Sequence, residues 1–333
     1  MLPPEWAKQQ FVQLTWPHRF TDWVNMLDEV NACFASIARV VTRFQNLLIV
    51  CDKTDDVKPW LHGADLNRIT FAEIKSDDTW ARDHGGITVF EGGKRVIYDF
   101  CFNGWGKKFD ADNDNLITRT LFKQEFFDAD VIYRDCNEFV LEGGSFESDG
   151  AGTILTTSAC LLSAYRNDLS RAEIETRLMD YFGLERVLWL EHGYLAGDDT
   201  DSHVDTLARF CNEHTIAYVK CDDTHDEHYY ELKLMEEELK QFKTKDRTPY
   251  KLIDLPMAEA VYDSDDRLPA TYANFLIING AVLVPTYQSM LDNVAIKKLE
   301  KAFPDREIIG IDCLPLIKQH GSLHCVTMQY PEK

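Results

Sequence analysis

The sequence lacks the patterns that mark several large classes of protein. It has nine cysteines but no Cys-x-x-Cys pair, so it indicates neither a zinc ribbon nor a disulfide framework. An odd number of scattered cysteines favours reduced thiols and a cytoplasmic location. The N-terminal stretch MLPPEWAKQQF has no basic segment followed by an apolar one. No apolar run approaches the roughly 20 residues of a membrane span. We therefore expect neither a signal peptide nor a membrane-spanning helix.

Positive charge is also scarce. Lys and Arg number 35 against 56 Asp and Glu, which gives a net charge of -21 at pH 7. Such a chain is repelled by nucleic-acid backbones and by anionic membranes, so we expect neither as a partner. A small cationic substrate would be attracted. The alternative interpretation is that the acidity only keeps the protein in solution.

Motifs for several common chemistries are missing as well. There is no Gly-rich phosphate-binding loop and no Gly-x-Ser-x-Gly turn. The acidic run from Asp198 to Asp205 lacks the glycine that an EF-hand loop needs. We therefore expect no metal and no cofactor. A metal-dependent hydrolase built on this run stays the alternative.

The sequence does contain a repeated order of predicted elements. Pairs of strand-like segments begin near residues 87, 145, 205 and 274, and each pair precedes a helical pattern and another strand. We interpret this order as a repeated ββαβ unit. The first quarter has one strand, Phe11 to Trp16, before a helix that Thr21 and Asp22 would cap. The final strand, Leu323 to Tyr330, would complete that unit and close a ring without exposed sheet edges.

No low-complexity linker divides the chain, so we expect a single domain over residues 1 to 333. Functional groups are concentrated at the ends of the predicted hairpins. Four stretches carry them: WARDHGG at 80 to 86, EGGS at 142 to 145, HVD at 203 to 205 and HGSLHC at 320 to 325. If the units surround an axis, these stretches converge on one pocket.

A proton-transfer pair is predicted within the third stretch. We predict that residues 203 to 210 form a strand, so that His203 and Asp205 face the same side. An imidazole beside a carboxylate suits general acid-base chemistry. Cys325 is predicted on the closing strand, where its thiol needs a cationic neighbour to become a nucleophile. That neighbour is either protonated His203 or the substrate. A buried structural cysteine is the alternative.

The carboxylates in these stretches suit a planar cation. Asp83 and Asp205 are placed to hold a guanidinium through bidentate, charge-assisted hydrogen bonds. Alternatively, they form structural ion pairs with their sequence neighbours Arg82 and Arg209. Glu142 either completes the cage or only ends a strand.

Taken together, the motifs resemble those of a known family. The resemblance runs in order along the chain through PPEW at 3 to 6, LTWPH at 14 to 18, WARDHGG at 80 to 86, FNGWG at 102 to 106, LEGGSF at 141 to 146, GDDTDSHVDTLARF at 197 to 210, NGAVLVPTY at 279 to 287 and LHCVTMQYP at 323 to 331. These segments are similar to the agmatine deiminases of the guanidine-modifying (pentein) superfamily, which also includes bacterial peptidylarginine deiminases. The resemblance implies a five-bladed α/β propeller of ββαβ units.

It also implies a hydrolase that converts agmatine to N-carbamoylputrescine and ammonia through a covalent cysteine amidino-thioether, in polyamine biosynthesis or agmatine catabolism. The implied site consists of catalytic Cys325, His203, Asp83 and Asp205, and substrate-binding Glu142, Trp80 and Asp199. Cys325 would be the nucleophile and His203 the general acid and base. Taken alone, Trp80 is either a core residue or a wall over a cation. Members of the family are often dimers or larger, which implies a homo-oligomer.

The sequence departs from the family at three places that bear on pocket shape. His320-Gly321-Ser322 stands where three glycines are usual, Gly86 replaces a proline, and Ser202 replaces a glycine. A deiminase of another guanidine, such as free or peptidyl arginine, is therefore the main alternative. The acidic run Asp198 to Asp201 favours an amine tail, because an α-carboxylate would need an arginine. A non-catalytic polyamine-binding protein is the alternative outside enzymes.

Overall fold

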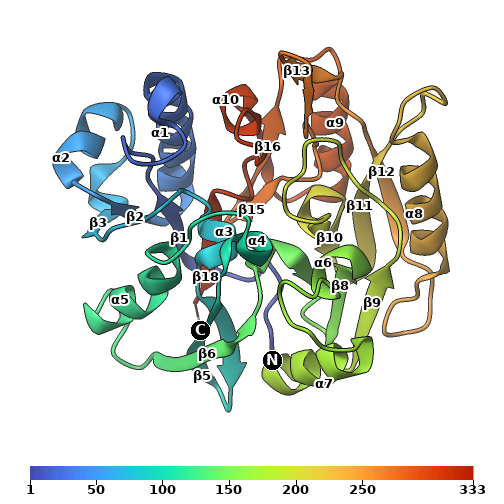
Figure 1. Ribbon diagram of the computed structural model, residues 1–333, viewed down its shortest axis with the longest axis horizontal. Coiled ribbons are helices and arrows are strands. Elements are labelled where there is room, and N and C mark those ends of the chain that lie inside the picture. Colours follow the sequence, from blue (N-terminus) through green and yellow to red (C-terminus); the bar gives the residue numbers. More distant parts are fainter. Residues whose placement is uncertain (333) are drawn as a thin grey trace.

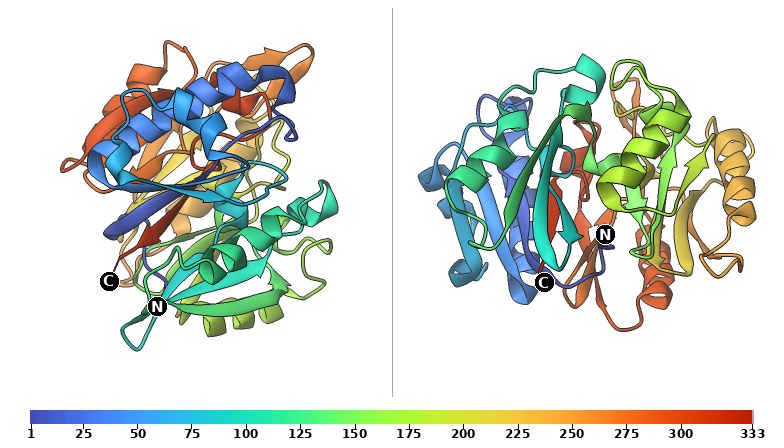
Figure 2. Two further views of the ribbon diagram at one scale, coloured as in Figure 1. Left: turned by 90° about the vertical axis from the view of Figure 1, so that its left-hand side faces the viewer. Right: turned by 90° about the horizontal axis from the view of Figure 1, so that it is seen from below.

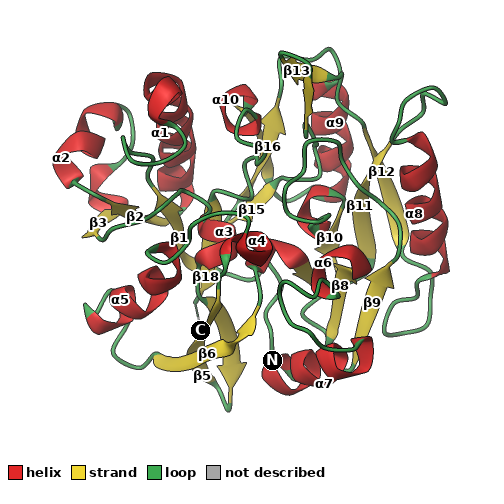
Figure 3. Cartoon of the chain, in the orientation of Figure 1, coloured by secondary structure: helices red, strands yellow, loops and turns green. Residues whose placement is uncertain are grey.

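Mixed strands and helices build the whole chain in the computed structural model, which describes residues 1–332. Within that range the strands form five sheets of three or four strands and one two-stranded hairpin. The longer helices lie on the outside of these sheets, whereas the short helices α3 (Ala81–His84) and α4 (Gly104–Lys107) lie near the middle of the molecule (Figures 1 and 3).

The predicted ββαβ repeat is confirmed. Strand β4 (Ile87–Glu91) pairs antiparallel with β5 (Lys94–Cys101), and β5 pairs in parallel with β6 (Ile132–Val140) after helix α5 (Ile117–Lys123). An antiparallel pair needs only a tight turn, whereas a parallel pair needs a crossover, which explains the order.

Three further units follow the same order. The first consists of β7 (Phe146–Ser148), β8 (Thr153–Thr157), α7 (Arg171–Phe182) and β9 (Arg186–Leu190). The second consists of β10 (Ala208–Asn212), β11 (Thr215–Lys220), α8 (Tyr229–Gln241) and β12 (Lys251–Pro256). The third consists of β15 (Leu276–Ile278), β16 (Ala281–Thr286), α9 (Asp292–Ala302) and β17 (Glu307–Asp312).

The two ends of the chain build the remaining sheet together. Strand β1 (Gln9–Thr15) pairs antiparallel with β18 (Thr327–Pro331) and parallel with β2 (Asn46–Cys51), and β3 (Ile69–Glu73) extends the sheet. Helix α1 (Leu27–Phe44) connects β1 to β2. The last strand therefore completes the first unit, as predicted, and the two termini lie near each other in every view (Figure 2).

Short elements lie within the units or connect them. They are α2 (Thr54–Val57), α6 (Ser158–Leu161), α10 (Leu314–Ile317) and the hairpin of β13 (Val261–Asp263) and β14 (Asp266–Leu268). Each long helix buries one apolar stripe against its sheet. In α1, for example, Val30, Phe34, Ile37 and Val41 are fully buried at helical spacing. In the described part of the chain, no helix combines the length and the apolar character that crossing a membrane requires.

Three local predictions are wrong. Helix α1 begins at Leu27, without a side-chain cap from Thr21 or Asp22. Strand β10 begins at Ala208, so His203 precedes a single 3₁₀ turn and Asp205 lies within it. Strand β18 begins at Thr327, so Cys325 lies in a turn before the strand.

The two turns that replace the predicted strand starts have the same cause. Thr206 donates both its backbone N–H and its hydroxyl to the carbonyl of His203, at 3.2 and 2.8 Å. Thr327 does the same to the carbonyl of His324, at 3.1 and 3.0 Å. Such local side-chain bonds compete with the ladder of a sheet. Both functional segments are therefore turned inward before their strands begin.

Buried charges connect several of the sheets to one another. The guanidinium of Arg209 on β10 pairs with Glu147 on β7 and, at 2.8 Å, with Glu5 of the N-terminal segment. It also donates to the carbonyl of Phe275, which leads into β15. An unpaired buried charge is costly, so these contacts fix the relative positions of the segments that carry them.

Candidate active site

A cavity of about 180 Å³ opens where the predicted stretches meet. Four of the predicted site residues line it: Trp80, Asp83, Asp199 and Cys325. The rest of its wall is aromatic and polar, and consists of Asp22, Asp78, Trp105, Phe109, Thr200, Gln319, His320 and Gly321. A thiol at one end of an acidic, aromatic-walled cavity suits a small cationic substrate.

The thiol of Cys325 is held in the cavity wall by its neighbour Asn274. The backbone N and the Sγ of Cys325 lie 3.4 and 3.5 Å from the side-chain oxygen of Asn274. Burial, together with the charges of Asp205 and Asp83, raises the pKa of this thiol well above its ordinary value. Without a bound cation the thiol is therefore neutral. A bound cation would oppose those charges and favour the thiolate.

His203 is a buried cation beside Asp83, one of the two aspartates near this thiol. Its side chain is 1% exposed, and its Nδ1 lies 3.6 Å from Oδ1 of Asp83. Burial lowers the pKa of His203, but the charges of Asp83 and of Cys160 raise it to about 10. Burial also raises the pKa of the Cys160 thiol, so at neutral pH that thiol is uncharged and Asp83 supplies the charge. His203 is therefore an imidazolium at neutral pH.

Asp83 is positioned by two donors and is itself ionised near neutral pH. The indole N–H of Trp105 donates to its Oδ2 and the backbone N–H of Gly144 to its Oδ1, each at 3.0 Å. Burial raises the pKa of Asp83 to about 6, although the positive charge of His203 lowers it. Above that pH the carboxylate and the imidazolium form a buried pair.

The convergence of the site is measured most directly at Gly144. A Cβ atom added there would lie 2.6 Å from Nδ1 of His203, 2.8 Å from Oδ1 of Asp83 and 3.1 Å from Oδ2 of Asp205. Three polar side chains from two separate segments, the turn with His203 and Asp205 and the short helix α3 with Asp83, therefore face one point. The predicted convergence of these three residues is confirmed, although turns rather than a shared strand face produce it.

Asp205 is anchored by one oxygen only. Its side chain is fully buried, and its Oδ2 accepts a hydrogen bond of 2.7 Å from Nδ1 of His324. Its Oδ1 has no partner among residues 1–332. Burial raises the pKa of Asp205, but the hydrogen bond and the charge of His324 outweigh it and keep the pKa below its ordinary value. The carboxylate is therefore a permanent anion with one oxygen free.

The alternative of structural ion pairs within the sequence motifs is wrong. Arg82 contacts the carbonyl of His324 and lies 3.8 Å from Glu5, while Arg209 pairs with Glu147 and Glu5. The two arginines thus neutralise another pair of carboxylates. Asp83 and Asp205 are left for a different cation.

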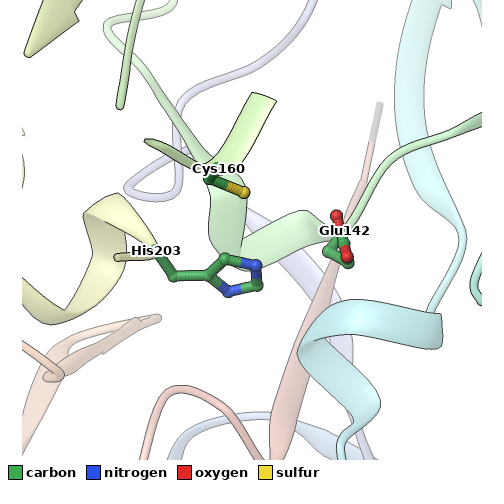
Figure 4. A group of neighbouring side chains, drawn as sticks. All are labelled: Glu142, Cys160 and His203. Atoms are coloured by element: carbon green, nitrogen blue, oxygen red, sulfur yellow. The ribbon is translucent and has the colours of Figure 1, made fainter. Parts of the chain in front are cut away.

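Glu142 lies behind the imidazole and does not line the cavity. Both of its oxygens accept from Nε of Arg166, at 2.8 and 3.0 Å, and both side chains are fully buried. Glu142, Cys160 and His203 lie beside one another, with one polar atom of each within 4.8 Å of the others (Figure 4). The donor types suit a metal, but the guanidinium of Arg166 and the imidazolium would repel one. The group therefore supports His203 instead.

The outer part of the cavity is acidic and rigid. Trp80 is buried, its indole N–H donates to Oδ2 of Asp78 at 3.0 Å, and its ring contacts Trp105. A side chain at Gly321 would lie 2.0 Å from the Trp80 ring, which requires glycine there. Asp199 is half-exposed, with its carboxylate 4.0 Å from Nδ1 of His320. Trp80 thus both packs in the core and walls the cavity.

Sequence reasoning missed several residues of the site. Trp105, Asn274 and His324 hold the predicted groups, and Arg166 and Cys160 lie behind them. Two of them carried a signal, because Trp105 lies inside FNGWG and His324 directly precedes Cys325. The others come from parts of the chain without a motif of their own.

A thiol and a carboxylate in the cavity wall, with an imidazolium and a second carboxylate beside them, are the groups that a guanidine-modifying enzyme needs. Comparison with known proteins gives the family. The chain belongs to the Porphyromonas-type peptidyl-arginine deiminase family, whose model matches residues 1–331. The resemblance stated from the motifs is thereby confirmed.

Individual relatives agree with this assignment. The chain is 31% identical to the agmatine deiminase of Stutzerimonas stutzeri, over 99% of this chain and 95% of the relative. It is 57% identical to the crystal structure of a putative arginine deiminase from Porphyromonas gingivalis, with a TM-score of 0.95, over 99% and 97% of the two chains. The C. jejuni agmatine deiminase with substrate bound is 39% identical, with a TM-score of 0.92, over 99% and 96%.

A more distant structure shares the fold alone. The dimethylarginine dimethylaminohydrolase of Pseudomonas aeruginosa is 12% identical, with a TM-score of 0.50 over 97% of this chain and 100% of that one. The two proteins therefore have the same fold.

Proposed function

We propose that this protein hydrolyses agmatine to N-carbamoylputrescine and ammonia. The observation that carries the proposal is the convergence of His203, Asp83 and Asp205 on Gly144, next to the cavity that holds the Cys325 thiol. Relatives named agmatine deiminases, at 31% and 39% identity over nearly the whole chain, support it.

The first step is binding of the guanidinium. Its delocalised charge makes the central carbon a poor electrophile, so it must be held in one plane. Asp83 and the free oxygen of Asp205 would accept its N–H groups. Burial and the charges of Asp205 and Asp83 raise the pKa of the Cys325 thiol. The positive charge of the bound guanidinium opposes this increase and lowers the pKa. The thiol proton passes to solvent, and a thiolate forms beneath the central carbon.

The chemistry then passes through a covalent intermediate. The Cys325 thiolate attacks the central carbon, and the C–N bond to a terminal nitrogen breaks. His203 donates its proton to that nitrogen, which leaves as ammonia. The remaining amidino-thioether is attacked by water, which gives a proton to the now neutral His203. Collapse of that adduct breaks the C–S bond and releases the carbamoyl product, and the hydroxyl proton passes to the departing sulfur, which restores the thiol. Glu142, held by Arg166, lies beside His203 and supports the imidazole.

The cavity wall favours agmatine over arginine. Its lining includes the carboxylates of Asp22, Asp78 and Asp199 but, within the described chain, no Lys or Arg that would pair with an α-carboxylate. Asp199 and Trp80 would meet the ammonium tail. Arginine is the second candidate, since the relative at 57% identity is described as a putative arginine deiminase.

The broader assignments are proposals of the same kind. The five sheets would form the blades of a five-bladed propeller, with residues 1 to 333 as one catalytic domain. All nine cysteines are free, which supports a cytoplasmic setting. The pathway would be putrescine biosynthesis or agmatine catabolism, and the protein would assemble as a homodimer or larger oligomer.

Ammonia release tests the function. Agmatine, arginine and a short arginine peptide are supplied separately to the wild type and to Cys325→Ala. We expect release from agmatine by the wild type alone. No release from any of the three guanidines would exclude a deiminase and leave a polyamine-binding protein. Loss of activity with a chelator, together with activity in Cys325→Ala, would favour a metal-dependent hydrolase.

A further inference from the structure

A second buried histidine lies between the N-terminal segment and the active site. His324 is 1% exposed and directly precedes Cys325. Its Nδ1 lies 2.7 Å from Oδ2 of Asp205, and its Nε2 lies 2.6 Å from Oε2 of Glu5. Its backbone N–H donates to the side chain of Asn274 at 2.9 Å. Both ends of the ring and its own backbone are therefore held.

The far end of this chain of contacts is fixed. Oε1 of Glu5 accepts from the backbone N–H of Ile277 at 2.7 Å. The guanidinium of Arg209 lies beside both groups, 2.8 Å from Oε2 of Glu5 and 3.0 Å from Nε2 of His324. Because Ile277 and Arg209 hold the carboxylate of Glu5, the contact with Glu5 restricts rotation of the imidazole. Whatever the imidazole holds is held in one orientation.

The group it holds is one of the two site carboxylates. A carboxylate turns easily about its Cβ–Cγ bond unless an oxygen is anchored. In Asp205, Oδ2 is anchored by His324, whereas Oδ1 is buried without a partner among the residues that the structure describes. A group that must meet a planar substrate needs this kind of support from behind.

We propose that His324 is a positioning residue that turns the free oxygen of Asp205 toward the substrate guanidinium. The mechanism given above has no step for His324, and the inference rests on the proposed function. His324 touches no reacting atom and acts through Asp205. Its contact with Glu5 holds the imidazole in place. Its contact with Asp205 orients the carboxylate that would bind the substrate.

Two substitutions separate these contacts. The side-chain nitrogen of asparagine lies close to the place of histidine Nδ1, and that of glutamine lies close to the place of Nε2. His324→Asn therefore keeps a donor for Asp205 and gives up Glu5. His324→Gln keeps a donor for Glu5 and gives up Asp205. Both variants lose one buried hydrogen bond, so each is the stability control for the other.

The measurement is kcat and KM for agmatine together with thermal unfolding. We expect His324→Gln to lower kcat/KM by about 10- to 100-fold relative to His324→Asn, the range for one hydrogen bond to a charged group. The two melting temperatures should be similar. Equal losses of activity in both variants, or a larger loss in His324→Asn, would overturn the proposal and assign His324 a purely structural role.

Binding in an inactive background separates this proposal from the proposed function. Calorimetry measures agmatine binding to Cys325→Ser alone, and then with His324→Asn or His324→Gln added. If Cys325→Ser binds agmatine and only the Gln variant weakens that binding, the proposal holds. If all three bind equally, His324 does not position Asp205. If Cys325→Ser binds no agmatine while it stays folded, the proposed function itself is wrong.

Discussion

His203 and His324 are equally buried, yet their ring nitrogens have opposite surroundings. Both nitrogens of His324 lie within 2.7 Å of a carboxylate oxygen. Neither nitrogen of His203 has a hydrogen-bond partner within residues 1–332, and its nearest carboxylate oxygen, on Asp83, is 3.6 Å away. A buried polar group without a partner is costly, so it is retained where function needs it. The comparison agrees with the proposed roles, in which His203 moves a proton and His324 holds a neighbour.

The surroundings of His203 keep it charged without binding it tightly. Asp83 supplies the negative charge, and the pair titrates with pKa values of about 6 for Asp83 and about 10 for His203. An imidazolium at 3.6 Å remains free to turn toward a substrate nitrogen. His324 has no such freedom, because Asp205 and Glu5 hold both sides of its ring.

Replacing each histidine by alanine should give the largest difference between the two, in kcat for one and in melting temperature for the other. His203→Ala is expected to lower kcat by about 10²- to 10⁴-fold, the contribution of one general acid-base group. His324→Ala is expected to lower the melting temperature more, because it leaves the buried carboxylate of Asp205 without a donor, at a cost of about 1–3 kcal/mol, and also removes one of the partners of Glu5. Steady-state kinetics and thermal unfolding check the two effects. The reverse pattern would contradict the assignment of the two roles.

A methyl group at Gly144 should displace the free histidine without removing it. Gly144→Ala places a Cβ 2.6 Å from His203 and 2.8 Å from Asp83. Because a shift of about 1 Å in a reacting group costs about 100-fold, we expect kcat/KM to fall by about that factor. Gly310→Ala is the control, since its Cβ would meet only methyl groups, that of Thr286 at 3.0 Å and that of Ile296 at 3.6 Å, on a strand away from the cavity. Equal activities of the two variants would refute the crowding at Gly144.

The pH dependence of kcat/KM should report the Asp83–His203 pair. Asp83 must be ionised to hold the guanidinium, so activity falls as the pH drops through about 6. His203 must be protonated to donate to the leaving nitrogen, so activity falls as the pH rises through about 10. We expect a plateau between these values in the free enzyme. If kcat/KM instead rises near pH 6 and does not fall near pH 10, His203 does not need to be protonated and acts first as a base.

Cys160 should have the smallest effect of the group behind His203. Burial keeps its thiol neutral near pH 7, so its removal takes no charge away from His203. Cys160→Ala is therefore expected to retain kcat within about tenfold, with the loss arising from the small space left beside the imidazole. Cys160→Ser tests whether a polar group alone restores activity. A loss as large as that of His203→Ala would show that the thiol takes part in proton transfer.

Much of the fold was predictable because its signals are local. Asn279-Gly280 gives the two-residue turn between β15 and β16, and the helix after each hairpin makes the third strand parallel. The true starts of β10 at Ala208 and of β18 at Thr327, instead of at His203 and Leu323, were not predictable in this way. There the hydroxyls of Thr206 and Thr327 bond to nearby carbonyls, and nothing in the alternation of the sequence indicates it.

The residues of the site also differ in how far local sequence signals predict them. Cys325, His203, Asp83 and Asp205 could be named from the sequence because each lies in a motif rich in functional groups. Their supports could not. Arg166 reaches Glu142 from a loop 24 residues away, and Glu5 meets His324 across 319 residues. Such contacts depend on how the sheets are placed, which no short segment specifies.

The account depends on Cys325 carrying the substrate, and mass spectrometry of the quenched enzyme tests that directly. Wild-type protein is mixed with agmatine, acid-quenched within a turnover and digested. The account predicts that the peptide containing Cys325 gains the mass of agmatine less ammonia, and that Cys325→Ala gains none. Turnover with no adduct on any peptide, or an adduct on the peptide of Cys160, would contradict it.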